Sequence, residues 1–203
     1  IFEQCFGYAL NVDPTQFTGK LVRKSEANGA HDGRIIEAPC AAEPGFVYQR
    51  VIDNSIAGER VEDLRCPTVG GKIPLVILKR RPISNRFANS NESVEVVETH
   101  TVLSALEQAR LAEFALAMQL DWGGLDVLRD KTDGRVYVVD VNKTDMGPPI
   151  AMTPDDKIRV TQMLAAAFLD FLRPAPRLLY LSDAASALIC VCPAVARYPQ
   201  HNQ

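Results

Sequence analysis

The sequence predicts an α+β fold with antiparallel sheets, divided into two α+β subdomains and a C-terminal extension. Three observations lead to this prediction. Short strand-like runs separated by glycine-containing turns fill residues 17–81, the apolar spacing becomes helical over 101–120, and two further β-rich runs follow within 124–142. The expected units are a nucleotide-binding lid with an antiparallel sheet, a metal-binding α+β unit and an extension, over 1–82, 83–174 and 175–203.

The first part of the chain reads as consecutive strands. The pair Gly70-Gly71 lies between the last two runs. Because glycine adopts positive φ without a steric penalty, this pair is the strongest local signal for a tight hairpin. An antiparallel sheet is therefore expected from the runs at residues 21–24, 46–53, 60–65 and 72–81.

Two helices follow from apolar periodicity. In the first, over 101–120, apolar side chains recur every three or four residues. The second begins at Thr153, where Pro154 suits the first helical position and Asp156 follows the cap by three residues. Arg173-Pro174 ends it, and the polar segment 85–93 is expected to be an exposed loop.

The sharpest chemical signal lies in the second hairpin, over 124–130 and 136–142. If its turn is centred on Asp133, Asp126 lies opposite Asp140, and Asn142 shares the face of Asp140. Two carboxylates facing each other at about 5 Å repel unless a cation lies between them. Carboxylate and amide oxygens suit Mg²⁺ or Mn²⁺ carrying nucleotide phosphates. The alternative is that Asp126 faces solvent and Asp140 pairs with an arginine.

Two weaker signals concern phosphate. Lys24 ends a strand before a loop with glycines, which can place a charge and backbone N–H groups against phosphate oxygens. Its ordinary alternative is a solvated lysine between two strands. Arginines on adjacent strands, Arg65 on one and Arg80 and Arg81 on the next, could clamp a transferred phosphoryl group, or could simply be solvated.

Composition excludes several partner classes. The chain has 22 Lys and Arg against 25 Asp and Glu, so it lacks the basic excess that nucleic-acid binding requires. Its five cysteines are scattered and odd in number, which favours a reduced, cytoplasmic protein without structural zinc. The longest apolar stretch, 178–196, contains Asp183 and Pro193, so no membrane span is expected.

Taken in order, these pieces resemble the ATP-grasp superfamily over about residues 21–149. The resemblance rests on the strand ending in lysine, the strand Tyr48-Gln-Arg-Val-Ile-Asp53, the run Asp63-Leu-Arg65 before the Gly-Gly hairpin, and the two oxygen-bearing runs around Asp126 and Asp140. It implies ATP and Mg²⁺ (or Mn²⁺) as cofactors. The roles that it implies are phosphate and lid contacts for Lys24, Ser25, Asn28, Gly29 and Gly33, adenine contacts around Gln49, Arg50 and Val51, charge neutralisation by Arg65 with Arg80 or Arg81, and metal binding by Asp126, Asp140 and Asn142.

The resemblance also implies an activity. In the family, a carboxylate is phosphorylated to an acyl phosphate and attacked by an amine or similar nucleophile, with release of ADP and phosphate. Small-molecule substrates and a homodimer are expected. A small-molecule kinase on the same scaffold and a catalytically silent nucleotide-binding module are the alternatives. Asp140 stands where glutamate is usual, Arg50 where an acidic residue is common, and the family's N-terminal domain has no counterpart here.

Overall fold

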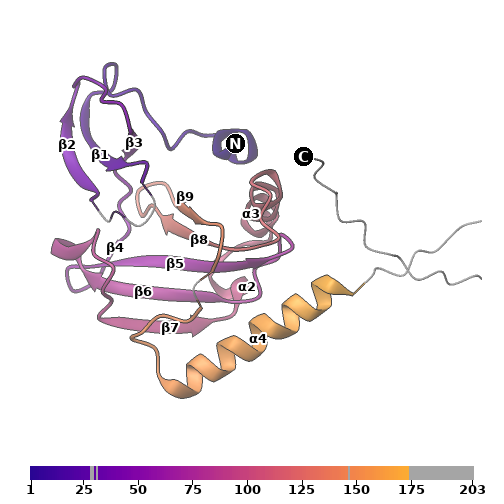
Figure 1. The fold of residues 1–203 in the computed structure, drawn as a ribbon. Coiled ribbons are helices and arrows are strands. Elements are labelled where there is room, and N and C mark those ends of the chain that lie inside the picture. Colours follow the sequence, from indigo (N-terminus) through magenta and orange to yellow (C-terminus); the bar gives the residue numbers. More distant parts are fainter. Residues whose placement is uncertain (28–29, 31, 146, 174–203) are drawn as a thin grey trace, which may run out of the picture.

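A computed structural model describes residues 1–27, 30, 32–145 and 147–173 of the chain. The α+β class is confirmed, because helices flank two antiparallel sheets (Figure 1). Asn28 and Gly29 of the expected lid loop lie outside the described residues, as does the expected C-terminal extension at 175–203.

The smaller sheet contains three antiparallel strands in the order β2-β1-β3. Leu21 and Tyr48 are buried on one face, where they pack with Ala38. Strand β2 was not among the predicted runs, because its Ile35-Ile36 pair interrupts the alternation of polar and apolar residues. The bounds are β1 (Gly19–Ser25), β2 (Arg34–Ala38) and β3 (Phe46–Arg50).

The larger sheet is also antiparallel, in the order β7-β6-β5-β8-β9, and β4 adds to β5. The predicted Gly70-Gly71 hairpin is confirmed: both glycines have positive φ, 54° and 78°. The bounds are β4 (Ser55–Ile56), β5 (Arg60–Val69), β6 (Val76–Pro82), β7 (Ser93–Val97), β8 (Trp122–Arg129) and β9 (Val136–Asn142).

The two sheets meet at a different point of the chain from the expected subdomain boundary at residue 82. The chain passes from the small sheet to the large one between β3 and β4, at residues 51–54. Strands β5 and β6 belong to the large sheet because β5 pairs with β8, more than fifty residues later. Non-local pairing of this kind leaves no signal in local periodicity. The division into folding units at residue 82 stays a prediction.

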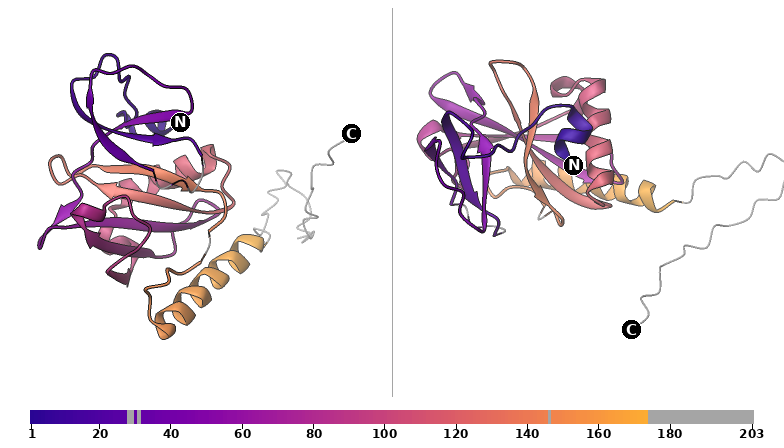
Figure 2. Two further views of the ribbon diagram at one scale, coloured as in Figure 1. Left: turned by 60° about the vertical axis from the view of Figure 1, so that its left-hand side comes forward. Right: turned by 90° about the horizontal axis from the view of Figure 1, so that it is seen from above.

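Helices cover both faces of the large sheet. Leu111 and Phe114 of α3 pack on one face, together with the short α1 and α2, while Val160 and Leu164 of α4 pack on the other. Figure 1 shows α3 beside β8 and β9 and α4 below β7, and Figure 2 gives two further views. None of the helices in the described part of the chain is long and apolar enough to cross a membrane. The bounds are α1 (Phe2–Phe6), α2 (Thr99–Val102), α3 (Ala105–Ala117) and α4 (Pro154–Leu172), with a 3₁₀ turn at Ile83–Asn85.

Both long helices begin at side-chain caps. The predicted start of α4 is confirmed, because the Thr153 side chain accepts a hydrogen bond from the Asp156 backbone N–H. The expected single helix over 101–120 is instead two helices, since Leu103 is extended and Ser104 starts α3 with a capping box to Glu107. A new cap therefore interrupts a continuous apolar period.

Glu107 gives the fold a defined acid sensitivity. Burial works to raise the pKa of Glu107, but Arg129, 2.7 Å away, and the Ser104 cap outweigh it and hold the pKa below its ordinary value. A depressed folded-state pKa stabilises the fold above the unfolded-state value of about 4.3 and loses that contribution as the pH falls through the folded-state value. We expect Glu107→Gln to lower the free energy of unfolding at neutral pH and to have less effect at about pH 3, as measured by urea denaturation. An equal effect at both pH values would contradict this account.

Candidate functional site

The hairpin of β8 and β9 brings the predicted metal ligands to one place. Asp126 lies directly opposite Asp140, as predicted, and Gly124 opposite Asn142. Nearer the turn, however, Arg129 pairs with Val136, one residue off the register that a turn centred on Asp133 would give. The Asn142 amide donates to both carboxylates, with Nδ2 3.3 Å from Asp126 Oδ2 and 3.4 Å from Asp140 Oδ2. Two carboxylates and one amide thus converge on one face of the large sheet.

A β-bulge next to this pair matters for the geometry. Asp126 pairs with Asp140, but the next residue, Val127, pairs with Val138, which leaves Val139 as an extra residue on β9. Val127 and Val138 face the core beneath α3, whereas Asp126 and Asp140 face the opposite side. The bulge therefore lets β9 keep its apolar contacts with the core and still present Asp140 beside Asp126.

Asp126 is neutralised by two basic side chains from neighbouring strands. Lys79 Nζ lies 2.8 Å from Asp126 Oδ1, and Arg65 Nη1 lies 3.0 Å from Oδ2. Burial works to raise the pKa of Asp126, but the two cations outweigh it and hold the pKa below its ordinary value. Asp140 is exposed, and no ion pair joins it to a described residue. In the alternative interpretation of the sequence, Asp126 faces solvent and Asp140 pairs with an arginine. The structure shows the reverse, because Asp126 pairs with Arg65 and Asp140 is exposed.

Arg65 is held by a second carboxylate that sequence reasoning missed. Its Nη2 lies 2.6 Å from Asp145 Oδ1, and the Asp145 side chain is only 2% exposed. Gly124 makes room for this guanidinium, since a Cβ there would lie 2.4 Å from Nη2. Asp145 follows Asn142 by three residues in a segment without strand or helix periodicity, so the sequence contains no pattern that would have identified it.

Strand alternation divides the three consecutive basic residues of β6. Lys79 and Arg81 are on the same face as Asp126, whereas Arg80 is on the opposite face, in ion pairs with Glu62 and Glu95. The structure does not bring Arg80 to the carboxylates. Instead it brings Lys79, which was not among the predicted site residues.

Arg81 lies on the same face of the sheet as Asp126, but its guanidinium is hydrogen-bonded to other residues. It is buried, and its guanidinium donates to Asp63 and to the carbonyl oxygen of Arg86. Asp63 in turn accepts a hydrogen bond from Asn54, in the segment that joins the two sheets. Arg81 thus ties the large sheet to that segment and to the loop after β6.

The side chain of Lys24, on β1 of the small sheet, contacts β9 of the large sheet. Its ammonium donates to the carbonyl oxygen of Val139, the bulged residue of β9. Burial lowers the pKa of Lys24, although the nearby carboxylates of Asp140 and Asp126 favour its charged form. Figure 2 shows the small sheet standing over the side of the large sheet formed by β8 and β9. The predicted phosphate-binding lysine and the predicted metal ligands therefore lie near one another, at the place where the small sheet contacts β9.

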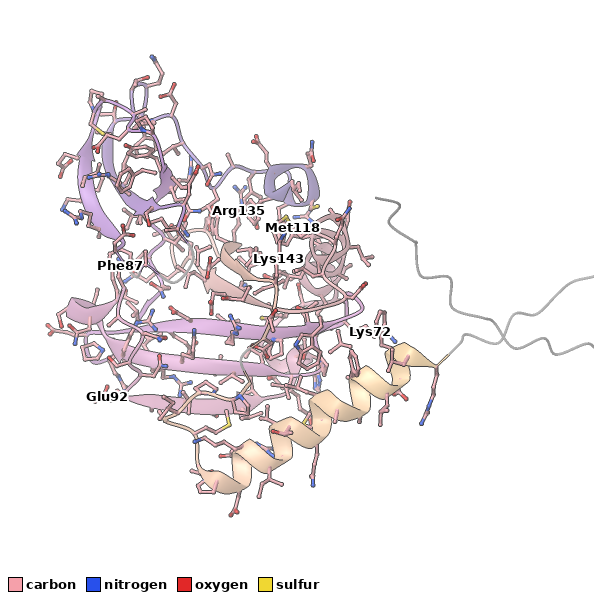
Figure 3. The ribbon with its side chains drawn as sticks, in the orientation of Figure 1. Lys72, Phe87, Glu92, Met118, Arg135 and Lys143 are labelled. Carbon is pink, nitrogen blue, oxygen red and sulfur yellow. The ribbon has the colours of Figure 1, made fainter. Side chains whose placement is uncertain are left out.

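The described part of the predicted lid loop touches the other sheet. The backbone N–H of Ser25 donates to Asp32, and the buried Ser25 hydroxyl has no partner among the described residues. Gly33 packs against Phe87, since a Cβ on Gly33 would lie 2.8 Å from the Phe87 ring. Phe87 lies between the small sheet and the large one (Figure 3). The loop that follows β1 thus contacts the loop that follows β6.

The predicted adenine-contact residues lie where the chain leaves β3. Gln49 is buried and donates to the side chain of Asn11, whereas Arg50 is exposed. Val51 opens the segment between the sheets, and neither of its backbone groups is hydrogen-bonded to another described residue. A small cavity of about 220 Å³ adjoins this point; Arg50, Val51, Lys20 and Tyr137 are among the residues that line it.

The donors fit a hard divalent cation. The amide nitrogen of Asn142 lies between the two carboxylates, and turning the amide over would place its oxygen there, so all three side chains could offer oxygen to one ion. Among the described residues, including this site, no three His, Cys, Asp or Glu side chains gather in a metal-binding arrangement, so the third ligand here would be the amide of Asn142. A magnesium ion here would need further oxygens from water or phosphate to complete its shell.

Part of the chain is similar to two solved enzyme structures, the ATP-grasp ligase PsnB and the macrocyclase MdnC. The ligase PsnB with minimal precursor, Mg and ADP is 17% identical, with a TM-score of 0.49, over 74% of this chain and 47% of that one. The macrocyclase MdnC bound with precursor peptide MdnA from Microcystis aeruginosa MRC is 14% identical, with a TM-score of 0.41, over 74% of this chain and 49% of that one. The chain thus spans about half the length of these enzymes. No protein-family model and no curated protein matches it.

Proposed function

We propose that this chain is the nucleotide- and metal-binding catalytic part of an ATP-dependent ligase of the ATP-grasp type. The observation that carries the proposal is the position of Lys24, whose ammonium contacts the carbonyl oxygen of Val139 and lies near the carboxylates of Asp140 and Asp126. A lysine from one sheet and a hard-cation site on the other would hold a triphosphate between them. Asp126, Asp140 and Asn142 would bind Mg²⁺ or Mn²⁺, which would neutralise and orient the phosphate tail.

The remaining contacts to the nucleotide follow from position. The Ser25 hydroxyl, which has no partner among the described residues, and the loop through Asn28, Gly29 and Gly33 would close over the phosphates. The backbone groups of Val51, which are not bonded to any described residue, would read the edge of the adenine, beside Gln49 and Arg50. Where many ATP-grasp enzymes have an acidic residue that accepts hydrogen bonds, this chain has Arg50. The ribose hydroxyls would therefore meet a hydrogen-bond donor at this position.

The proposed chemistry forms a carbon–nitrogen bond. An oxygen of the acceptor carboxylate attacks the γ-phosphorus of ATP, the bond to the bridging oxygen breaks, and ADP leaves. An amine then attacks the acyl carbon of the resulting acyl phosphate, phosphate departs with the electron pair of the C–O bond, and the nitrogen loses a proton to water. Arg65, on the face that carries the metal ligands, would offset the charge that develops on the transferred group, and Arg81 would hold the adjoining loop in place.

Asp140→Asn tests the proposed metal and nucleotide site without disturbing the ion pairs. We expect the wild-type chain to bind the ATP analogue AMPPNP at least about tenfold more tightly with Mg²⁺ than without, because the metal bridges carboxylates and phosphate. Asp140→Asn should lose most of this difference, as measured by isothermal titration calorimetry. Because Asp140 is exposed, the melting temperature of the variant should differ little from that of the wild type.

The matched control is Asp155→Asn, which removes the same charge from an exposed position in the first turn of α4. It should bind the analogue as the wild type does in both conditions. If Mg²⁺ makes no difference to the wild-type protein, the proposed function is wrong. Once binding is established, a stable phosphorylated product would indicate a kinase, whereas release of ADP that depends on an amine would support the ligase.

A further inference from the structure

Both carboxylate oxygens of Asp126 are occupied by protein cations. Lys79 Nζ binds Oδ1 at 2.8 Å, and Arg65 Nη1 binds Oδ2 at 3.0 Å. Lys79 and Arg65 are mostly buried, with side chains 17% and 13% exposed. Each carboxylate oxygen keeps a second lone pair, so a divalent ion can still take Asp126 as a ligand, but it would then lie beside both protein cations. The repulsion between like charges would favour the release of one of them.

Of the two cations, Lys79 is the one that can leave. Arg65 has a second carboxylate partner, Asp145, and its planar guanidinium fills the space above Gly124. Lys79 has no hydrogen-bond acceptor other than Asp126 among the described residues. Its ammonium is a point charge on a flexible stem, whereas the guanidinium of Arg65 is fixed at both ends of its fork.

A displaced Lys79 would remain on the same face of the sheet. The acidic residue opposite it on β5 is Asp63, which is buried and already bound to Arg81 and Asn54. The anion left for the Lys79 ammonium would be the phosphate tail that arrives with the metal. A mostly buried ammonium group without a partner is unfavourable, so release from Asp126 and capture by phosphate would be coupled.

We propose that Lys79 exchanges partners in the reaction: it binds Asp126 until the metal and nucleotide enter, and then contacts the transferred phosphate. This inference rests on the proposed function and adds to it a catalytic residue that the sequence did not single out. It predicts that Lys79 opposes the binding of metal alone and favours the binding of a nucleotide with a γ-phosphate.

Lys79→Met separates these two effects, which have opposite signs. We expect it to bind Mn²⁺ alone more tightly than the wild type, by about threefold to tenfold, as measured by electron paramagnetic resonance of the free ion. With Mg²⁺ present, the ratio of AMPPNP to ADP affinity should fall by about tenfold, the size expected for one lost charge-assisted hydrogen bond. A purely structural role would not tighten metal binding.

Two variants serve as controls. Lys72→Met removes the same charge from an exposed turn at the far end of the sheet (Figure 3) and should change neither quantity. Lys79→Arg retains a cation and should restore most of the preference for AMPPNP. If Lys79→Met does not fold, Lys79→Gln removes the charge while keeping a donor for Asp126 and tests the same two quantities.

The outcomes distinguish this inference from the proposed function. If Mg²⁺ does not promote nucleotide binding to the wild type, the proposed function fails and the inference fails with it. If it does, but the neutral Lys79 variants bind Mn²⁺ alone no more tightly than the wild type, or keep the full preference for AMPPNP, the exchange is wrong while the proposed function stands.

Discussion

Replacing Asp126 with alanine is expected to lower the free energy of unfolding by about 3–5 kcal/mol, the usual effect of removing one partner from a buried ion pair. Asp126 is the common partner of Lys79 and Arg65, and its loss leaves Lys79 without an acceptor among the described residues. The same substitution should abolish the effect of Mg²⁺ on nucleotide binding. Urea denaturation and titration with AMPPNP measure the two effects separately.

Asp126→Asn is the matched variant for this prediction. Its amide oxygen can still accept one hydrogen bond, so it should lose less stability than the alanine variant while also losing Mg²⁺-dependent binding. Asp140→Asn should lose binding with little change in stability, because Asp140 is exposed. An Asp126→Ala protein as stable as the wild type would show that the ion pairs of Asp126 with Lys79 and Arg65 do not stabilise the packing of β5, β6 and β8.

Gly124→Ala is expected to be nearly as damaging, although it adds only one methyl group. The new Cβ would lie 2.4 Å from Nη2 and 2.5 Å from Cζ of Arg65, so the guanidinium would have to move. Its movement would leave Asp145, with a side chain 2% exposed, without its cation. We expect a loss of about 3 kcal/mol in unfolding free energy, measured by urea denaturation.

A double-mutant cycle shows whether this loss arises through Arg65. In an Arg65→Ala background the three atoms nearest the new Cβ are absent, so most of the loss caused by Gly124→Ala should disappear. An equal loss in both backgrounds would place the effect in the strand itself. Gly123 would not serve as a control, because a Cβ there would lie 2.6 Å from the carbonyl oxygen of Asn142.

Local chemistry was sufficient to predict several parts of this protein. The Gly70-Gly71 turn and the start of α4 at Thr153 both depend on residues close together in the chain. In each case a steric or hydrogen-bonding preference acts within a few residues, so the sequence contains the whole cause.

Helix continuity marks the limit of that approach. The apolar period runs through 101–120, but Ser104 and Glu107 form a capping box that starts a new helix. The S-x-x-E pattern is present in the sequence and could have identified the break. By contrast, the Ile35-Ile36 strand β2 contains no alternation, and it forms because β1 offers it an antiparallel edge.

The sequence by itself determined that the side chains of Lys79 and Arg81 point the same way and that Arg80 points the other way, because strand alternation is a local property. Only the tertiary structure decided which of these faces carries Asp126. That choice depends on the registers of β5 with β6 and of β5 with β8, which join residues up to 63 positions apart, as in the pair of Leu64 and Val127. The same holds for Arg65 with Asp145 and for Lys24 with Val139, contacts that exist only once separate strands have packed.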